Sequence, residues 1–176
     1  MDEPTDPGER ADPAERLNAL LGDGDETLAT AESLTGGLVG SRVTDVPGAS
    51  AYFDRGFVTY TYDAKRELLG VSRESLDAHG AVSDPVVREM AAGARDRADA
   101  DWAVATTGIA GPTGGTDEKP VGLVYVGVAH AAPWGTEESF VLAERAVLDG
   151  DRDAVKRGAA ERALDALVRT IEDVDG

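Results

Sequence analysis

Helical and strand-like segments alternate along most of this 176-residue chain, and that alternation constrains the fold more than any other feature. Helical periodicity and helix-start signals mark 14–21, a segment from 33 or 35 to 47, 63–69, a segment from 83 onward, and 151–171. Strand patterns mark 27–30, 53–61, 102–107, 121–129 and 138–143, the last two flanking a turn at 133–135. Interleaved helices and strands with one terminal hairpin predict an α/β protein, a three-layer α/β/α sandwich with a mixed sheet.

Composition divides the chain into a short lead-in and one domain. Residues 1–13 are acidic and contain three prolines, which predicts a flexible acidic N-terminal segment. The remaining length, with 41% hydrophobic residues overall, suffices for one hydrophobic core but not for two ordinary domains. We therefore expect a single domain over residues 14–174.

The chain is strongly acidic, with 34 Asp and Glu against 17 Lys and Arg and a formal net charge of −17. Such a charge repels a phosphate backbone, so we expect no nucleic-acid partner. Self-repulsion of this size opposes compaction unless salt screens it, which favours a protein adapted to a highly saline cytoplasm. An ordinary acidic protein is the alternative interpretation.

Cysteine is absent, which excludes disulfides, thiolate catalysis and cysteine-ligated zinc. The two histidines, His79 and His130, fall at the ends of predicted elements and are expected at the surface. Acidic residues show no metal-ligand spacing, so we expect no metal site. The chain shows neither a secretory leader nor an apolar run of membrane-spanning length, so no membrane partner and a cytoplasmic location are expected.

Three side chains suggest nucleophilic chemistry. Ser33 lies where a strand turns into a helix, a corner that presents a hydroxyl and backbone amides together, although a simple helix cap is the competing interpretation. Lys65 is one of only three lysines, and a desolvated lysine can act as a base where arginine cannot. Tyr60 is a candidate proton relay beside it. A solvated lysine and a core tyrosine are the structural alternatives.

Residues 108–122 form a loop that is too rich in glycine for a simple connector. It matches neither the P-loop nor the dinucleotide-binding fingerprint. Its backbone amides are suited to hold a phosphate or a carboxamide, while a long ordered loop without a ligand is the alternative.

These motifs resemble the C-terminal domain of the competence-damage-inducible protein CinA, the nicotinamide mononucleotide amidohydrolase family. The resemblance covers about Leu28 to Ala166. It rests on Ala31-Glu32-Ser33-x-Thr35-Gly36-Gly37, Phe53 to Tyr60, Gly80-Ala81-Val82-Ser83, Gly108-Ile109-Ala110-Gly111-Pro112-x-Gly114-Gly115, Lys119-Pro120-Val121-Gly122 and Gly150-Asp151-Arg152. Longer members carry an additional N-terminal domain that resembles molybdopterin-binding proteins, so this chain is expected to be a stand-alone version.

The resemblance implies hydrolysis of nicotinamide mononucleotide to nicotinic acid mononucleotide and ammonia, in pyridine nucleotide recycling, by a homodimer that needs no cofactor. It implies Ser33 as nucleophile, Tyr60 as proton relay and Lys65 as general base. Which of Tyr60 and Lys65 takes the serine proton is left open. Substrate contacts are expected from Thr35, Gly36, Gly37, Thr107, Gly108, Gly111, Gly114, Gly115 and Arg152, the last as a phosphate partner or else a surface ion-pair residue. A non-catalytic nucleotide-binding module and a serine/lysine hydrolase of another amide or ester are the alternative functions.

Overall fold

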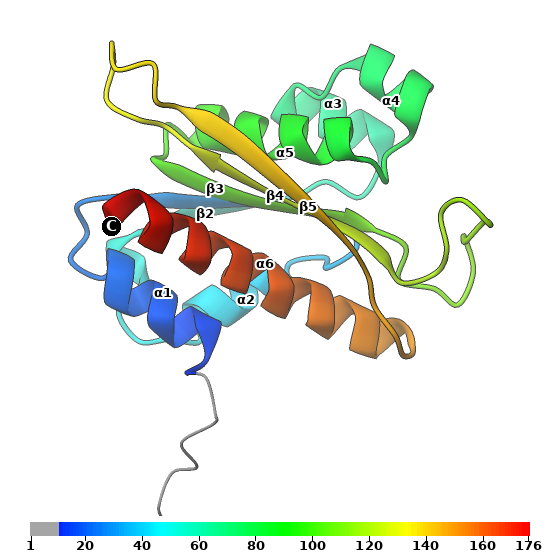
Figure 1. Ribbon diagram of the computed structural model, residues 1–176, viewed down its shortest axis with the longest axis horizontal. Helices are drawn as coiled ribbons and strands as arrows, with labels where there is room; N and C mark the ends of the chain where they lie inside the picture. The colour runs from blue at the N-terminus through cyan, green and yellow to red at the C-terminus, as the bar shows by residue number, and fades with distance from the viewer. Residues whose placement is uncertain (1–10) are drawn as a thin grey trace, which may run out of the picture.

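A five-stranded mixed sheet forms the middle layer of the computed structural model, which describes residues 11–176 (Figure 1). The strands are β1 (Leu28–Glu32), β2 (Phe53–Val58), β3 (Trp102–Gly108), β4 (Leu123–His130) and β5 (Phe140–Val147). Their order is β2-β1-β3-β4-β5, and β1 pairs in parallel with both β2 and β3. Strand β4 is antiparallel to β3 and to β5, which confirms the mixed sheet and its hairpin.

Helices cover both faces of the sheet, so the three-layer sandwich is confirmed (Figure 1). One face carries α1 (Pro13–Leu21), α2 (Leu38–Thr44) and α6 (Arg152–Asp175), and the other carries α3 (Tyr62–Leu69), α4 (Arg73–His79) and α5 (Asp84–Ala98). A separate cluster of buried apolar side chains lies between the sheet and each helical layer. Because both faces are covered, the central strands β1 and β3 are buried almost throughout.

A glycine lets two helices of the same layer, α3 and α5, approach closely. A Cβ built on Gly93 of α5 would lie 2.0 Å from the backbone oxygen of Leu69, at the end of α3. No side chain fits in that space, so glycine at this position lets α3 pack directly against α5. This contact helps to hold α3, the helix that carries Lys65, against the sheet.

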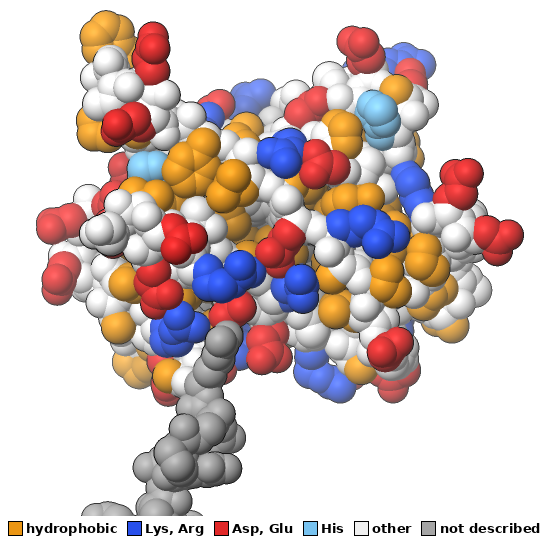
Figure 2. All heavy atoms as spheres, in the orientation of Figure 1, with side chains coloured by type: hydrophobic (Ala, Val, Ile, Leu, Met, Phe, Trp, Pro, Cys, Tyr) orange, Lys and Arg blue, Asp and Glu red, His pale blue; other side chains and the backbone are white. Residues whose placement is uncertain are grey.

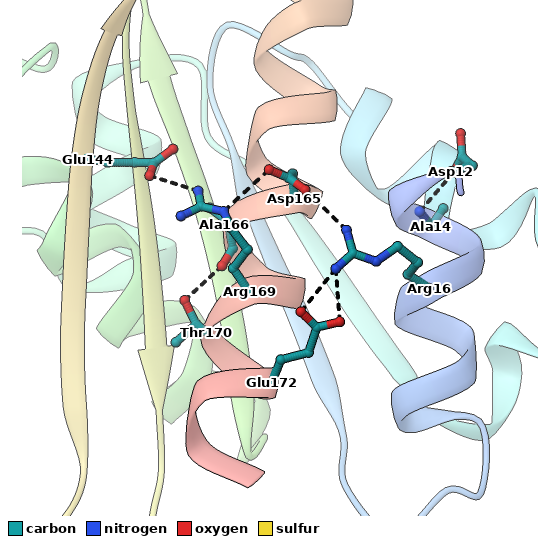
Figure 3. A network of polar contacts seen from close by, with 9 residues as sticks. All are labelled: Asp12, Ala14, Arg16, Glu144, Asp165, Ala166, Arg169, Thr170 and Glu172. Atoms are coloured by element: carbon teal, nitrogen blue, oxygen red, sulfur yellow. Dashed lines mark hydrogen bonds and ion pairs between the residues drawn. The ribbon is translucent and has the colours of Figure 1, made fainter. Parts of the chain in front are cut away.

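Arginine ion pairs connect α6 to α1 and to β5 (Figure 3). Arg16 of α1 contacts Asp165 at 3.4 Å and Glu172 at 2.8 Å, both on α6. Arg169 of α6 contacts Asp165 at 3.3 Å and Glu144 of β5 at 3.1 Å. Blue and red side chains alternate over this face in Figure 2, so positive groups are distributed among the carboxylates.

Several boundaries differ from the sequence predictions. Most of the predicted flexible segment, residues 1–10, lies outside the described residues. The prediction is wrong for its end, because Pro13 is the first residue of α1 and Asp12 accepts a hydrogen bond from the Ala14 backbone at 2.8 Å.

Two further differences concern where helices begin. Helix α3 begins one residue before the predicted 63–69, because the Thr61 hydroxyl accepts the Ala64 backbone N–H and caps the helix. Of helix α4 only the end, at His79, was predicted; its start was not, because Leu76 is its one buried residue and its apolar periodicity is correspondingly weak.

The expectation that both histidines are at the surface is half right. His79 is exposed, but His130 is buried with 7% of its surface accessible. Its ring stacks on Trp102 with centroids 4.1 Å apart, because antiparallel pairing sets His130 directly opposite Trp102. Among the described residues, no helix is long and apolar enough to cross a membrane.

Candidate active site

The candidate site lies at the carboxyl end of β1, between β2 and β3. The chain leaves β1 toward α2 on one face and leaves β2 toward α3 on the other, so the connections diverge at this edge. Such a divergence leaves a crevice beyond the strand ends, which is where open α/β sheets bind ligands. Ser33 follows β1 directly, and its backbone N–H donates to the Thr106 carbonyl of β3 at 3.0 Å.

A buried carboxylate holds the turn that carries Ser33. Glu32, the last residue of β1, is 2% exposed and accepts hydrogen bonds from the backbone N–H groups of Gly37, Val39 and Gly40 at 2.9 to 3.0 Å. It also accepts the Thr35 hydroxyl at 2.6 Å. The carboxylate thus caps the N-terminus of α2, where the helix has unsatisfied donors and a positive dipole end.

The cap interpretation of Ser33 is therefore wrong. The N-cap residue of α2 is Gly37, at φ 104°, and the carboxylate of Glu32, rather than the side chain of Ser33 or Thr35, accepts the backbone N–H groups of Gly37, Val39 and Gly40. This arrangement leaves the Ser33 hydroxyl without a capping role. Its side chain faces a cavity of about 170 Å³ instead.

Ser33 and Lys65 are in direct contact. Lys65 Nζ lies 2.9 Å from Ser33 Oγ and 2.6 Å from the Thr59 carbonyl oxygen, and the lysine is 1% exposed. In residues 11–176 no carboxylate forms an ion pair with this ammonium, so burial is not offset by a counter-charge. Burial lowers the pKa of Lys65 to about 8. A lysine with such a pKa is neutral in about a tenth of molecules at pH 7 and in about half at pH 8, and the neutral form can accept a proton.

Tyr60 borders the same cavity but contacts a different partner. Its ring is 62% exposed, and its hydroxyl accepts a hydrogen bond from the guanidinium of Arg152 at 3.1 Å. A second nitrogen of Arg152 donates to the Gly111 carbonyl at 2.7 Å. Arg152 therefore links the Tyr60 hydroxyl to the glycine-rich loop.

The cavity wall combines polar chemistry with small side chains. The lining residues are Ser33, Leu34, Tyr60, Lys65, Ala81, Val82, Thr107, Gly108, Ala110 and Arg152. The Thr107 hydroxyl donates to the Ala81 carbonyl at 2.8 Å, which fixes the segment before α5 against β3. The structure thus brings six predicted site residues to this cavity or its rim: Ser33, Tyr60, Lys65, Thr107, Gly108 and Arg152, with Gly111 held beside them through Arg152.

The other predicted residues lie elsewhere. Gly36 and Gly37 line a neighbouring hollow with Thr35, and their own N–H groups already donate to Ser33 O and to Glu32. Gly114 and Gly115 lie on the exposed part of the loop and do not line the Ser33 cavity.

Sequence reasoning missed two contributors, Glu32 and the Thr59 carbonyl. In a chain with 34 acidic residues, one carboxylate gives no signal of its own. The detectable clue was the position of Glu32, a carboxylate just after a strand that the sequence predicted to be buried. Among residues 11–176, no group of three or more His, Asp or Glu side chains is arranged to hold a metal ion.

Fold and site together define a class, the α/β sandwiches with a buried serine–lysine pair at the carboxyl edge of a mixed sheet. Within that class, the chain belongs to the CinA C-terminal domain family, whose model matches residues 10–171. It is 52% identical over 141 residues to the nicotinamide-nucleotide amidohydrolase PncC of Escherichia coli K12, an alignment that covers 80% of this chain and 82% of that protein.

Other relatives are longer or known by structure. A CinA-like protein of Chlorobaculum tepidum is 52% identical over 149 residues, but the chain spans only 35% of its length. The crystal structure of competence/damage inducible protein CihA from Agrobacterium tumefaciens superposes with a TM-score of 0.84 at 39% identity, covering 97% of this chain and 99% of that one. The family and the fold expected from the sequence motifs are thereby confirmed.

Proposed function

We propose that this protein is an amidohydrolase that converts nicotinamide mononucleotide to nicotinic acid mononucleotide and ammonia, in pyridine nucleotide recycling. The observation that carries the proposal is the 2.9 Å contact between Ser33 Oγ and a buried Lys65 that has no carboxylate partner among residues 11–176. The similarity to the E. coli nicotinamide-nucleotide amidohydrolase supports the substrate.

In the proposed first step, neutral Lys65 accepts the hydroxyl proton of Ser33 while Oγ bonds to the carboxamide carbon. The carbonyl π electrons move to oxygen and give a tetrahedral oxyanion. The C–N bond then breaks, and the departing nitrogen takes the proton from Lys65 to leave as ammonia. An ester between Ser33 and the nicotinoyl group remains.

Water hydrolyses this ester in the second step. Lys65 accepts a proton from the attacking water and returns it to Ser33 Oγ as the acid product leaves. Tyr60 is proposed to relay protons between Lys65 and the leaving nitrogen, because Arg152 fixes its hydroxyl at the cavity rim. Gly108 and Thr35 are proposed to supply backbone donors to the oxyanion, since the N–H groups of Gly36 and Gly37 already donate to Ser33 and Glu32.

The test is ammonia release from nicotinamide mononucleotide in multimolar KCl, with wild type compared to Ser33→Ala and Lys65→Ala. Turnover by wild type that is lost in both folded variants supports the proposal. A folded wild type that binds the nucleotide without turning it over would indicate a binding module. Faster turnover of an unrelated amide or ester would assign the serine–lysine pair to another substrate.

A homodimer in a saline cytoplasm is part of the proposal. The outer side of β2 has no strand partner within the described chain, and Val58 and Tyr62 are exposed beside it. Pairing of this edge with a second copy would cover that backbone. Light scattering after size exclusion, at high and low KCl, measures both the oligomeric state and its salt dependence.

A further inference from the structure

A second hollow, of about 490 Å³, adjoins the Ser33 turn on the side of α6. Its lining comes from the start of α2 and from the first turns of α6. The lining residues are Thr35, Gly36, Gly37, Leu38, Ser41, Asp153, Lys156 and Arg157. A Cβ built on Gly36 would meet nothing within 4 Å, so the backbone of the turn is open toward solvent there.

Lys156 is unusual among the cations of this chain. All twelve ion pairs in residues 11–176 use arginine, and Lys156 has no carboxylate within 4 Å although acidic residues outnumber basic ones two to one. Lys65 and Lys119, in contrast, donate to the backbone oxygens of Thr59 and His79. The half-buried ammonium of Lys156 is therefore available to a ligand in the hollow.

The Ser33 cavity is too small for a whole mononucleotide, so the substrate must also occupy a neighbouring space. At about 170 Å³ it is smaller than the roughly 300 to 1,000 Å³ of ordinary small-molecule sites. It is suited to a single pyridine ring with its carboxamide, so the ribose and phosphate of a mononucleotide must lie outside it.

Helix α6 connects the two spaces. Arg152 lines the Ser33 cavity and Lys156 lines the second hollow, and residues four apart lie on one face of a helix about 6 Å from each other along its axis. Arg152 is already bonded to Tyr60 and Gly111, which assigns it to the organisation of the site. Lys156, by contrast, forms no ion pair with any carboxylate in the described part of the chain.

We propose that the second hollow binds the 5′-phosphate of the substrate through Lys156, assisted by Arg157, while Arg152 positions Tyr60. This inference rests on the proposed function and moves the predicted phosphate contact from Arg152 to the next turn of α6. The carboxylate that faces the same hollow, Asp153, is paired with Arg157 at 2.9 Å, which reduces its repulsion of an anion. The N-terminal end of this 24-residue helix adds a favourable dipole.

Calorimetric binding tests the proposal, with every variant built on Ser33→Ala so that no ligand is consumed. The two ligands are nicotinamide mononucleotide and its dephosphorylated nucleoside, at one fixed KCl concentration. We expect Lys156→Met to weaken mononucleotide binding about tenfold or more and nucleoside binding less than about twofold. Lys156→Arg should restore most of the loss, and Arg162→Met, which removes a positive charge elsewhere on α6, should leave both affinities unchanged.

Three results overturn the phosphate site: equal weakening of both ligands, no weakening of either, or a phosphate-selective loss in Arg152→Met with none in Lys156→Met. The proposed function is judged separately by ammonia release from the otherwise wild-type enzyme. Turnover without Lys156 dependence rejects only the phosphate site. Phosphate-selective binding through Lys156 without turnover rejects only the amidase.

Discussion

The cavities at the two ends of the sheet differ in volume and in chemistry. The amino end of β1 and β3 opens on a cavity of about 670 Å³ lined by Glu26, Asp99, Asp101, His130 and Glu138 among others. The carboxyl end of the same strands holds a cavity of about 170 Å³. The larger space offers more acidic groups, but it contains no serine–lysine contact.

Polar groups at the amino end serve the fold. Glu26 accepts the indole N–H of Trp102 at 2.9 Å, and Asp101 accepts the backbone N–H and the hydroxyl of Thr27 at 2.8 and 3.1 Å. At the carboxyl end, burial instead lowers the pKa of Lys65, which contacts the Ser33 hydroxyl. The comparison teaches that a perturbed lysine pKa next to a hydroxyl is a better indication of a candidate functional site than cavity volume.

The largest expected effect separates the two ends directly. We expect Ser33→Ala to lower ammonia release by about 10⁴-fold or more, because no other group replaces the nucleophile. Asp99→Asn removes a charge from the larger cavity and should change the rate less than about twofold. Steady-state kinetics on folded variants measures both rates. A comparable loss of activity in Asp99→Asn would indicate that the active site includes the cavity at the amino end of the sheet.

The next effect concerns pH. If neutral Lys65 is the base, kcat/KM should rise about tenfold per pH unit below pH 8 and level off above it. Lys65→Arg, which keeps the charge but cannot release the proton, should be inactive at every pH. A wild-type profile without this limb would exclude Lys65 as the base.

The lowered pKa of Lys65 also determines how the free energy of unfolding should depend on pH. Below pH 8 the lysine is charged in both states, so the cost of burying the ammonium is fully present. Between about pH 8 and 10.5 the folded state releases its proton first, and this contribution to the free energy of unfolding should rise with pH. Denaturant titrations of wild type and Lys65→Met, which lacks the group, isolate the effect.

A smaller effect distinguishes two glutamates, one at each end. Glu32→Gln weakens a network of four hydrogen bonds, so we expect about 1 to 3 kcal/mol of destabilisation and roughly tenfold to hundredfold slower turnover. The matched control is Glu26→Gln, whose amide oxygen can still accept the one bond from Trp102 and which should not slow turnover. Equal rates in the two variants would show that the α2 cap does not position Ser33.

The smallest effect lies away from both ends. Arg16→Ala breaks the contacts of α1 with Asp165 and Glu172, which are partly exposed, so about 1 kcal/mol or less of stability should be lost. Turnover should be unchanged. Thermal unfolding at several KCl concentrations checks the loss, which should shrink as salt screens the pairs.

The sequence predicted the three-layer sandwich because most helices and strands have a clear amphipathic pattern. Residue type and family motif identified Ser33, Tyr60 and Lys65 as candidate site residues. The sequence did not reveal that Lys65 contacts Ser33, because 32 residues separate them and the contact depends on how α3 packs against α5. The burial of His130 was mispredicted because tertiary packing, not local pattern, determines it, whereas helix α4 lacks the apolar periodicity that would have revealed where it begins.

The three lysines have a practical consequence. Lys65 lines the Ser33 cavity, Lys119 lies on the loop that borders it, and Lys156 lines the adjoining hollow, whereas the other Lys and Arg side chains of the chain are all arginines. Apart from the chain's amino terminus, an amine-selective reagent therefore has targets only around the site. Acylating reagents would act on this protein as affinity labels do, and protection by a bound ligand, read by mass spectrometry at each lysine, would map the ligand without a crystal.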